Sequence, residues 1–305
     1  MFDDNEDPWG WNITSVGFKQ YDMKLDNSSK GLFKGMPAVQ RIEEGKVVTV
    51  VEALFSKGNS TVALDYKIYK DTPYIDIRTR IVMADKNKGI KIKLPLNGKS
   101  NYFSQSAYGT EFYPNDGNEN PQNRFVGVLN GDDAFVVYNK SGVHSCSKKG
   151  KNLYMTLLNG ACYCAHPTGP LGKNILLRED TYIENIELGT HEFYFRVQVN
   201  KFEECEKLAQ AFNHSPYVVE YYPHGDGNLA KNVLTISNPN ITITALKKRK
   251  YGGYLIRVFN GSNKPASGVL NILGKTKKIN LKKYEFKTFE FDGKKIDDAI
   301  DSSIY

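Results

Sequence analysis

Apolar and polar residues alternate over long stretches of this chain, most clearly in two neighbouring segments. From Thr61 to Tyr69, the apolar residues occupy every second position. From Tyr74 to Met83 the three isoleucines at 75, 77 and 81 face one way, and Asp76, Arg78 and Arg80 face the other. A period of two places successive side chains on opposite faces of a strand. The pattern predicts large antiparallel sheets with one face that is wet or covered by a partner.

Further strands are predicted along the whole chain from runs rich in Val, Ile, Tyr and Phe. In the first two thirds they cover Val47–Leu54, Ile90–Leu96, Arg124–Leu129, Ala134–Asn139, Leu153–Leu158 and Glu192–Val199. In the last third they are short and evenly spaced, at Val233–Ile236, Ile241–Leu246, Tyr254–Phe259, Gly268–Leu273 and Phe286–Phe291. Gly252-Gly253 predicts a tight hairpin. Short strands at even spacing are typical of a β-sandwich.

One helix is predicted, from Lys201 to His214, because apolar residues recur there at helical spacing and Pro216 follows. The segment from Tyr217 to Asn228 has turn chemistry throughout and is interpreted as a linker. We therefore expect two domains, a large β domain at residues 1–228 and a small β-sandwich at residues 229–305. The predicted class is all-β with one short helix between the two domains.

Residues 97–123 are predicted to form a long polar and aromatic loop, with a turn signal at Asn115–Asn118. A loop of this length in a compact domain is usually functional or contacts another part of the molecule. A turn holding an aromatic plug is predicted at Asp7–Gly10.

Composition narrows the functional classes. The chain has 305 residues and a net charge of +7, and its lysines are interspersed with acidic residues. No basic cluster interleaves with aromatic residues, so we expect a solvated surface and no nucleic-acid partner. No apolar run approaches the roughly 20 residues of a membrane span, and residues 1–7 are acidic where a secretion signal is basic. These features predict a soluble, cytoplasmic chain without a membrane partner.

The stretch Leu153–Pro170 ends in a loop with the chemistry-bearing residues Cys162, Cys164 and His166. A zinc site usually spaces its cysteines by two to four residues and needs four ligands, so this spacing of one favours a buried pair of thiols. Zinc binding and a nucleophilic Cys164 remain alternatives, but no third catalytic member is evident. The four cysteines are too few for a disulfide framework.

No phosphate-binding loop, dinucleotide-binding motif, nucleophile elbow or His-Glu-x-x-His motif occurs. Carboxylate pairs are available, as in any chain with 34 acidic residues, but the sequence does not show which of them meet across strands. From the residues alone, the chain is a large β protein with an aromatic surface and no evident catalytic set.

Several ordered stretches nonetheless resemble the C-terminal half of the family 38 α-mannosidases, especially the bacterial branch. These stretches are Phe2–Gly10, Val50–Phe55, Ile68–Asp76, Tyr154–Pro167, Gly189–Phe193, Ser237–Lys247 and Gly253–Asn260. The resemblance covers nearly the whole chain. It departs at Leu158–Ala161, where relatives often read Leu-Arg-Ser-Pro, and at Gly109–Pro114, where many read Gly-x-x-Glu-Arg-Pro. Both departures lie in loops that are able to approach a sugar.

The resemblance implies a large supersandwich like that of the galactose-mutarotase superfamily, followed by a smaller sandwich. In this family the nucleophilic Asp and the His and Asp zinc ligands belong to an N-terminal catalytic domain, to which nothing here is similar. The chain alone is therefore expected to be inactive, with no catalytic residue and no metal or other cofactor of its own. Zn²⁺ and the acid and nucleophile would lie in the missing domain, and Met1 would be an introduced start or the result of a truncated gene.

The implied function is the non-catalytic β region of a retaining α-mannosidase, which supports its own catalytic domain and supplies loops to the cleft for an α-mannoside or oligosaccharide. Candidate sugar-contacting residues are Tyr108, Tyr113, Arg124 and His166, because aromatic faces stack on pyranose rings and Arg donates to hydroxyls. Two alternatives use the same fold: a stand-alone aldose epimerase, with His144 or His166 opposite Glu111, and a free carbohydrate-binding module.

Overall fold

The fold is taken from a computed structural model, which describes residues 1–4, 20–26, 37–98, 100–161, 184–218, 220, 222, 232–250 and 252–299. The chain divides into two compact units, Met1–Asn200 and Lys201–Tyr305. The domain boundary expected near residue 228 lies outside the described residues. So do the turn expected at Asp7–Gly10 and the loop with Cys162, Cys164 and His166.

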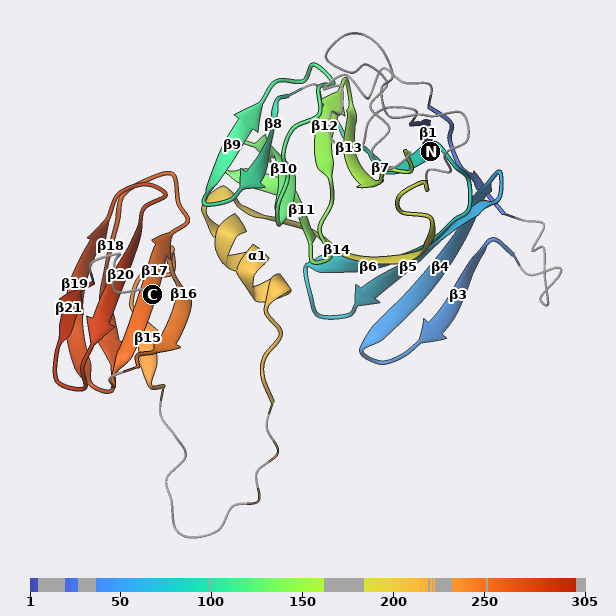
Figure 1. The fold of residues 1–305 in the computed structure, drawn as a ribbon. Helices are drawn as coiled ribbons and strands as arrows, with labels where there is room; N and C mark the ends of the chain where they lie inside the picture. The colour runs from blue at the N-terminus through green and yellow to red at the C-terminus, as the bar shows by residue number, and fades with distance from the viewer. Residues whose placement is uncertain are drawn as a thin grey trace. The chain divides into compact units, whose positions relative to one another are not determined.

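The first unit contains a ten-stranded sheet, which Figure 1 shows as a curved layer. Its strand order is β2 (Lys24–Leu25), β4 (Val48–Lys57), β5 (Ser60–Tyr69), β6 (Tyr74–Met83), β14 (Gly189–Lys201), β11 (Asp133–Asn139), β10 (Phe125–Asn130), β8 (Tyr102–Ser106) and β9 (Gly109–Tyr113), with β3 (Val39–Glu44) also paired to β4. Each of the long pairs β4–β5, β5–β6 and β6–β14 is antiparallel.

The alternation read from the sequence separates the two faces of this sheet. Ile77 and Ile81 on β6 lie in the main hydrophobic core, and Ile81 is completely buried. On the opposite face, Arg196 pairs with Asp76 at 2.7 Å, and Arg80 pairs with a carboxylate of Glu52 at 2.6 Å. Charged pairs between neighbouring strands, and between β4 and β6 across β5, suit a face that keeps contact with water. The predicted large antiparallel sheet is confirmed, with apolar residues on one face and charged residues on the other.

A four-stranded sheet packs against the core face of the large sheet. Its order is β1 (Phe2–Asp3), β7 (Lys88–Pro95), β13 (Asn152–Leu158) and β12 (Ser145–Lys149). One core cluster contains buried residues of both sheets, including Met83 and Phe195 from the large sheet and Ile90, Leu153 and Met155 from the small one. Burial of apolar surface between two sheets is the main stabilising term of a sandwich.

The small sheet also encloses a polar cluster around Glu119. The Glu119 carboxylate pairs with the Lys91 ammonium, and only 5% of each side chain is exposed. Three hydroxyl groups of strands β12 and β13 also donate to this carboxylate, from Ser145 (2.5 Å), Ser147 (3.0 Å) and Thr156 (3.2 Å). The cluster therefore attaches the chain segment before β10 to three strands at once.

The loop expected at residues 97–123 is wrong in its first half, which forms the hairpin β8–β9. Tyr102 pairs with Tyr113 and Ser106 pairs with Gly109 across a two-residue turn. The aromatic residues of the two strands occur in adjacent pairs, and the polar residues between them gave no strand pattern. The hairpin forms because the aromatic side chains of β8 are buried. Tyr102 and Phe103 are completely buried, and Phe103 packs against Phe125 at 6.2 Å between ring centroids.

The second unit begins with a 3-10 helix (Phe202–Glu204) and α1 (Cys205–Asn213), which confirms the predicted helix. A small sandwich follows. One sheet has the order β15 (Leu234–Ile236), β18 (Ala266–Ile272) and β19 (Lys275–Leu281). The other has the order β16 (Ile241–Lys248), β17 (Tyr254–Asn260), β20 (Phe286–Phe291) and β21 (Ile296–Asp298). Gly252 and Gly253 both have positive φ in the predicted β16–β17 hairpin.

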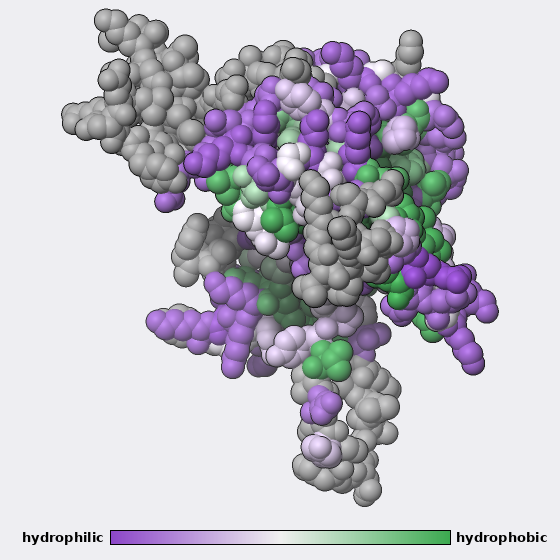
Figure 2. Space-filling view, turned by 90° about the vertical axis from the view of Figure 1, so that its right-hand side faces the viewer, coloured by the Kyte–Doolittle hydropathy of each residue, from purple (hydrophilic) through white to green (hydrophobic). Residues whose placement is uncertain are grey.

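The two sandwiches and the single α-helix of the described residues confirm the predicted all-β class. Where the structure describes the chain, none of its helices has the length and apolar character needed to cross a membrane. Figure 2 shows hydrophilic residues over much of the described surface on one side, with hydrophobic residues in smaller groups between them.

Candidate functional site

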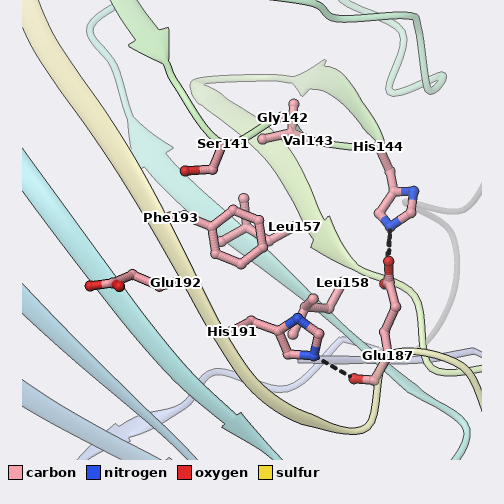
Figure 3. A pocket seen from close by; sticks show the side chains of 10 residues that line it. All are labelled: Ser141, Gly142, Val143, His144, Leu157, Leu158, Glu187, His191, Glu192 and Phe193. Atoms are coloured by element: carbon pink, nitrogen blue, oxygen red, sulfur yellow. Dashed lines mark hydrogen bonds and ion pairs between the residues drawn. The ribbon is translucent and has the colours of Figure 1, made fainter. Parts of the chain in front are cut away.

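A pocket of about 390 Å³ opens in the first unit where three segments meet. Figure 3 shows its lining: Ser141, Gly142, Val143 and His144 follow β11, Leu157 and Leu158 end β13, and Glu187, His191, Glu192 and Phe193 come from the start of β14 and the residues just before it. Apolar side chains and ionisable ones both line the pocket. Its volume and mixed lining are within the range of small-molecule sites.

Glu187 is the centre of the polar side of this pocket. Its carboxylate lies 2.8 Å and 3.0 Å from Nε2 of His144, and it accepts a 2.6 Å hydrogen bond from the backbone N–H of Asn159. The backbone carbonyl of Glu187 lies 3.0 Å from Nε2 of His191, so the two imidazoles contact Glu187 from different sides (Figure 3). Glu187 has a φ of +54°, a conformation that costs a non-glycine residue energy and needs support from its surroundings.

Two ionisable groups near the pocket have shifted pKa values. The hydrogen bond with Glu187 raises the pKa of His144, and burial opposes this effect only in part. Burial raises the pKa of Asp4 to about 6. Asp4 is completely buried, and neither of its carboxylate oxygens accepts a well-formed hydrogen bond from the described residues. The backbone amides of Gly160 and Ala161 and the imidazole of His144 favour its charged form, but burial outweighs them.

The described side chains offer hydrogen-bonding and apolar groups that suit ligand binding. General acid–base chemistry on a sugar needs two groups on either side of the reacting atoms. Here the His144 imidazole and the Glu187 carboxylate bond directly to each other. The Glu111 carboxylate, the partner considered for an epimerase, accepts hydrogen bonds from Tyr113 (2.8 Å) and Ser106 (3.2 Å) instead.

Three of the four sugar-contacting residues expected from the sequence lie on the β9–β8–β10 part of the large sheet. Tyr108 occupies the β8–β9 turn and is 46% exposed. Tyr113 ends β9, where its ring packs 5.6 Å from that of Tyr102, and burial raises its pKa to about 12. Arg124 precedes β10 and donates to the side-chain oxygen of Gln105 at 3.2 Å. His166 lies outside the described residues.

The hairpin register separates these three residues into two groups. Gln105, the partner of Arg124, is next to the β8–β9 turn that holds Tyr108, whereas Tyr113 pairs with Tyr102 at the opposite end of the hairpin. Phe112, which the sequence reasoning did not select, is 51% exposed on this edge strand and packs on Phe103 at 5.8 Å. No alternation in Gly109–Tyr113 marks it, and only the hairpin shows that its ring is exposed.

Of the pocket residues, His144 is a candidate from the sequence, but opposite Glu111; its actual partner Glu187 is marked by no local pattern. Glu187 is 43 positions from His144, and the fold alone brings them together. Among the described residues, no group of three or more His, Cys, Asp or Glu side chains is placed to bind a metal ion. The free thiols of Cys146 and Cys205 are buried, and burial raises the pKa of Cys146 to about 12, so this thiol is unreactive.

Two known structures have a fold similar to that of this chain. An α-mannosidase from Enterococcus faecalis V583 matches with a TM-score of 0.64 and 16% identity, over 83% of this chain and 35% of its own. A protein of glycosyl hydrolase family 38 from Enterococcus faecalis matches with a TM-score of 0.72 and 14% identity, over 95% of this chain and 39% of its own. The present chain thus spans less than two fifths of the length of either protein.

Sequence comparisons give the family directly. A search of curated proteins finds no match. The model of the "Glycosyl hydrolases family 38 C-terminal domain" matches residues 1–164, which is more than half of the chain. The chain therefore belongs to glycosyl hydrolase family 38 and carries its C-terminal domain.

Proposed function

We propose that this chain is the non-catalytic C-terminal β region of a retaining α-mannosidase that acts in the breakdown of mannose-containing glycans. The observation that supports this most strongly is the match of residues 1–164 to the family's C-terminal domain. The likeness in fold to an α-mannosidase over 83% of the chain agrees with it.

The acid, the nucleophile and a divalent metal, Zn²⁺ by resemblance, belong in this proposal to a catalytic domain outside residues 1–305. Two observations support the assignment. Both structural relatives are more than twice as long as the region that this chain matches. Two ionisable side chains of the pocket, His144 and Glu187, bond to each other. The described residues contain no cluster of metal ligands.

The proposed role of the chain is to support the catalytic domain and to supply side chains to the edge of the sugar cleft. The β8–β9 hairpin is suited to the second task because it presents exposed aromatic rings on a well-packed base. Tyr108 and Phe112 are about half exposed, while Phe103 beneath Phe112 is buried. Aromatic faces stack on the apolar faces of pyranose rings, and the Arg124 guanidinium is able to donate to hydroxyls. The expected cytoplasmic location stays a prediction.

A zinc titration tests where the metal site lies. Calorimetry of purified residues 1–305 with Zn²⁺ at pH 7 should show no stoichiometric site, because structural and catalytic zinc sites need three or four preorganised ligands. The variant Cys162→Ala/Cys164→Ala/His166→Ala is the matched control for the one ligand-like motif of the chain. A stoichiometric site that this variant loses would place a metal within the chain and contradict the proposal.

A further inference from the structure

Lysines and acidic residues are interspersed over residues 1–231, but the excess of positive charge is concentrated in the small sandwich, which the sequence analysis did not predict. Residues 232–299 contain 14 Lys and Arg residues and five Asp and Glu residues, whereas residues 1–231 contain 27 and 28. The sandwich alone thus has a net charge of +9, although the whole chain has +7. A charge density of this kind attracts polyanions over distances set by the salt concentration.

Three hairpin turns at one end of this sandwich bring cations together. They are β16–β17 (residues 249–253), β18–β19 (residues 273–274) and β20–β21 (residues 292–295), and we call this the basic end. Successive antiparallel strands reverse direction, so these three turns share one end while residues 261–265 and 282–285 share the other. Close contacts support this: Gly253 touches the backbone of Phe291, and the Lys277 ammonium donates to the carbonyl of Ile296 at 3.3 Å.

Hydrogen bonds close each turn of the basic end. Arg249 donates its backbone N–H to the carbonyl of Gly253 at 3.1 Å, and Gly274 donates to the side chain of Asn271 at 3.0 Å. The Asp292 carboxylate accepts from the backbone of Lys294 (2.8 Å) and Lys295 (2.9 Å), and these bonds lower its pKa. Turns closed in this way hold the neighbouring lysine Cα atoms in place before a ligand arrives.

Several of these cations are available to a ligand. Lys248, Lys275 and Lys294 are exposed, one beside each turn, and no described carboxylate pairs with them. Neighbouring strands lie about 4.8 Å apart and facing sheets about 10 Å apart, so the three ammonium groups are spread over a surface on the scale of a few sugar units.

We propose that the basic end binds an acidic polysaccharide, such as a polyuronate, through its carboxylate groups. The choice of a glycan over other polyanions rests on the proposed function, because a glycan-degrading enzyme gains effective concentration by holding its polymer away from the catalytic centre. That the basic end binds a polyanion of some kind is inferred only from its charges and its turns. The proposal adds a substrate class: mannose-containing glycans that also carry acidic groups.

Binding of purified residues 1–305 to polygalacturonate at low salt tests this, with neutral dextran as the negative control. The variant Lys248→Gln/Lys275→Gln/Lys294→Gln should weaken binding about tenfold, since each exposed charge contributes modestly. The variant Lys264→Gln/Lys282→Gln/Lys283→Gln removes the same charge from exposed lysines at the opposite end and should change the affinity less than about threefold. Equal thermal midpoints of the two variants show that both fold.

Loss of affinity in the first variant only, together with weakening by salt, supports the proposal. Absence of binding, or equal loss in both variants, overturns the basic end as a site. Tighter binding to single-stranded DNA or to anionic phospholipid vesicles than to polygalacturonate overturns the glycan assignment. None of these measurements involves hydrolysis of a mannoside, so their failure is distinct from failure of the proposed function.

Discussion

Replacing Glu119 with glutamine should lower the free energy of unfolding of the first unit by about 3–5 kcal/mol, because it removes one partner of a buried ion pair. The Lys91 ammonium would then lie in a site where only 5% of its side chain is exposed. Burial already lowers the pKa of Lys91 even with Glu119 opposite, so the loss of that carboxylate leaves the burial penalty uncompensated. Urea denaturation followed by circular dichroism measures the effect.

Two further variants separate the charge effect from a general loss of packing. Lys91→Met combined with Glu119→Gln should recover much of the lost stability, because an apolar side chain needs no buried partner. Glu192→Gln breaks the exposed pair with Arg78 on the wet face of the large sheet and should leave the transition nearly unchanged. If Glu119→Gln lowered the free energy of unfolding as little as Glu192→Gln does, the buried Lys91–Glu119 pair would not stabilise the first unit as described.

Asp4→Asn should stabilise the chain at pH 7 by up to about 3 kcal/mol. Burial raises the pKa of Asp4 from 3.8 to about 6 in the folded chain, so the folded state binds a proton more tightly than the unfolded one. A group shifted in this direction favours folding below pH 4 and disfavours it progressively as the pH rises to about 6. Asparagine has no charge to bury, so its advantage should be absent below about pH 4 and complete above about pH 6.

The neighbouring residue supplies the control for this prediction. Asp3 accepts hydrogen bonds from Lys88 and from Tyr21 (3.0 Å), so Asp3→Asn should destabilise the chain slightly at pH 7. Denaturation curves of both variants between pH 3.5 and pH 7.5 give the comparison. If Asp4→Asn lowered the stability at pH 7, the Asp4 carboxylate would have a charge partner that the described residues do not contain.

The sequence was most informative where a strand has one apolar face. β6 and β20 begin and end where predicted, at Tyr74–Met83 and Phe286–Phe291, because hydrophobic and charged positions alternate along most of β6 and three phenylalanines mark β20. Strand β19 was missed: lysines fill much of Lys275–Leu281, and its inward positions are recognisable only once Ile279 and Leu281 are seen to be buried. Strand β12 was missed for a similar reason, since Ser145–Lys149 is polar in sequence yet almost fully buried.

The candidate site was less accessible to sequence reasoning than the fold. Periodicity reports burial, whereas the contact between His144 and Glu187 depends on the return of the chain to the sheet after β13. The family resemblance pointed to Tyr108 and Tyr113 as aromatic residues that contact sugar. It did not identify Phe112, because the hairpin that exposes this ring replaced an expected loop.

We expect the reactive centre of the enzyme to lie outside these 305 residues. The most direct measurement is the release of p-nitrophenol from p-nitrophenyl α-mannoside by purified residues 1–305 with Zn²⁺ present, beside the Enterococcus faecalis α-mannosidase as the positive control. The account predicts no release above the rate without protein. Turnover that copurifies with the chain and persists after further purification would contradict it.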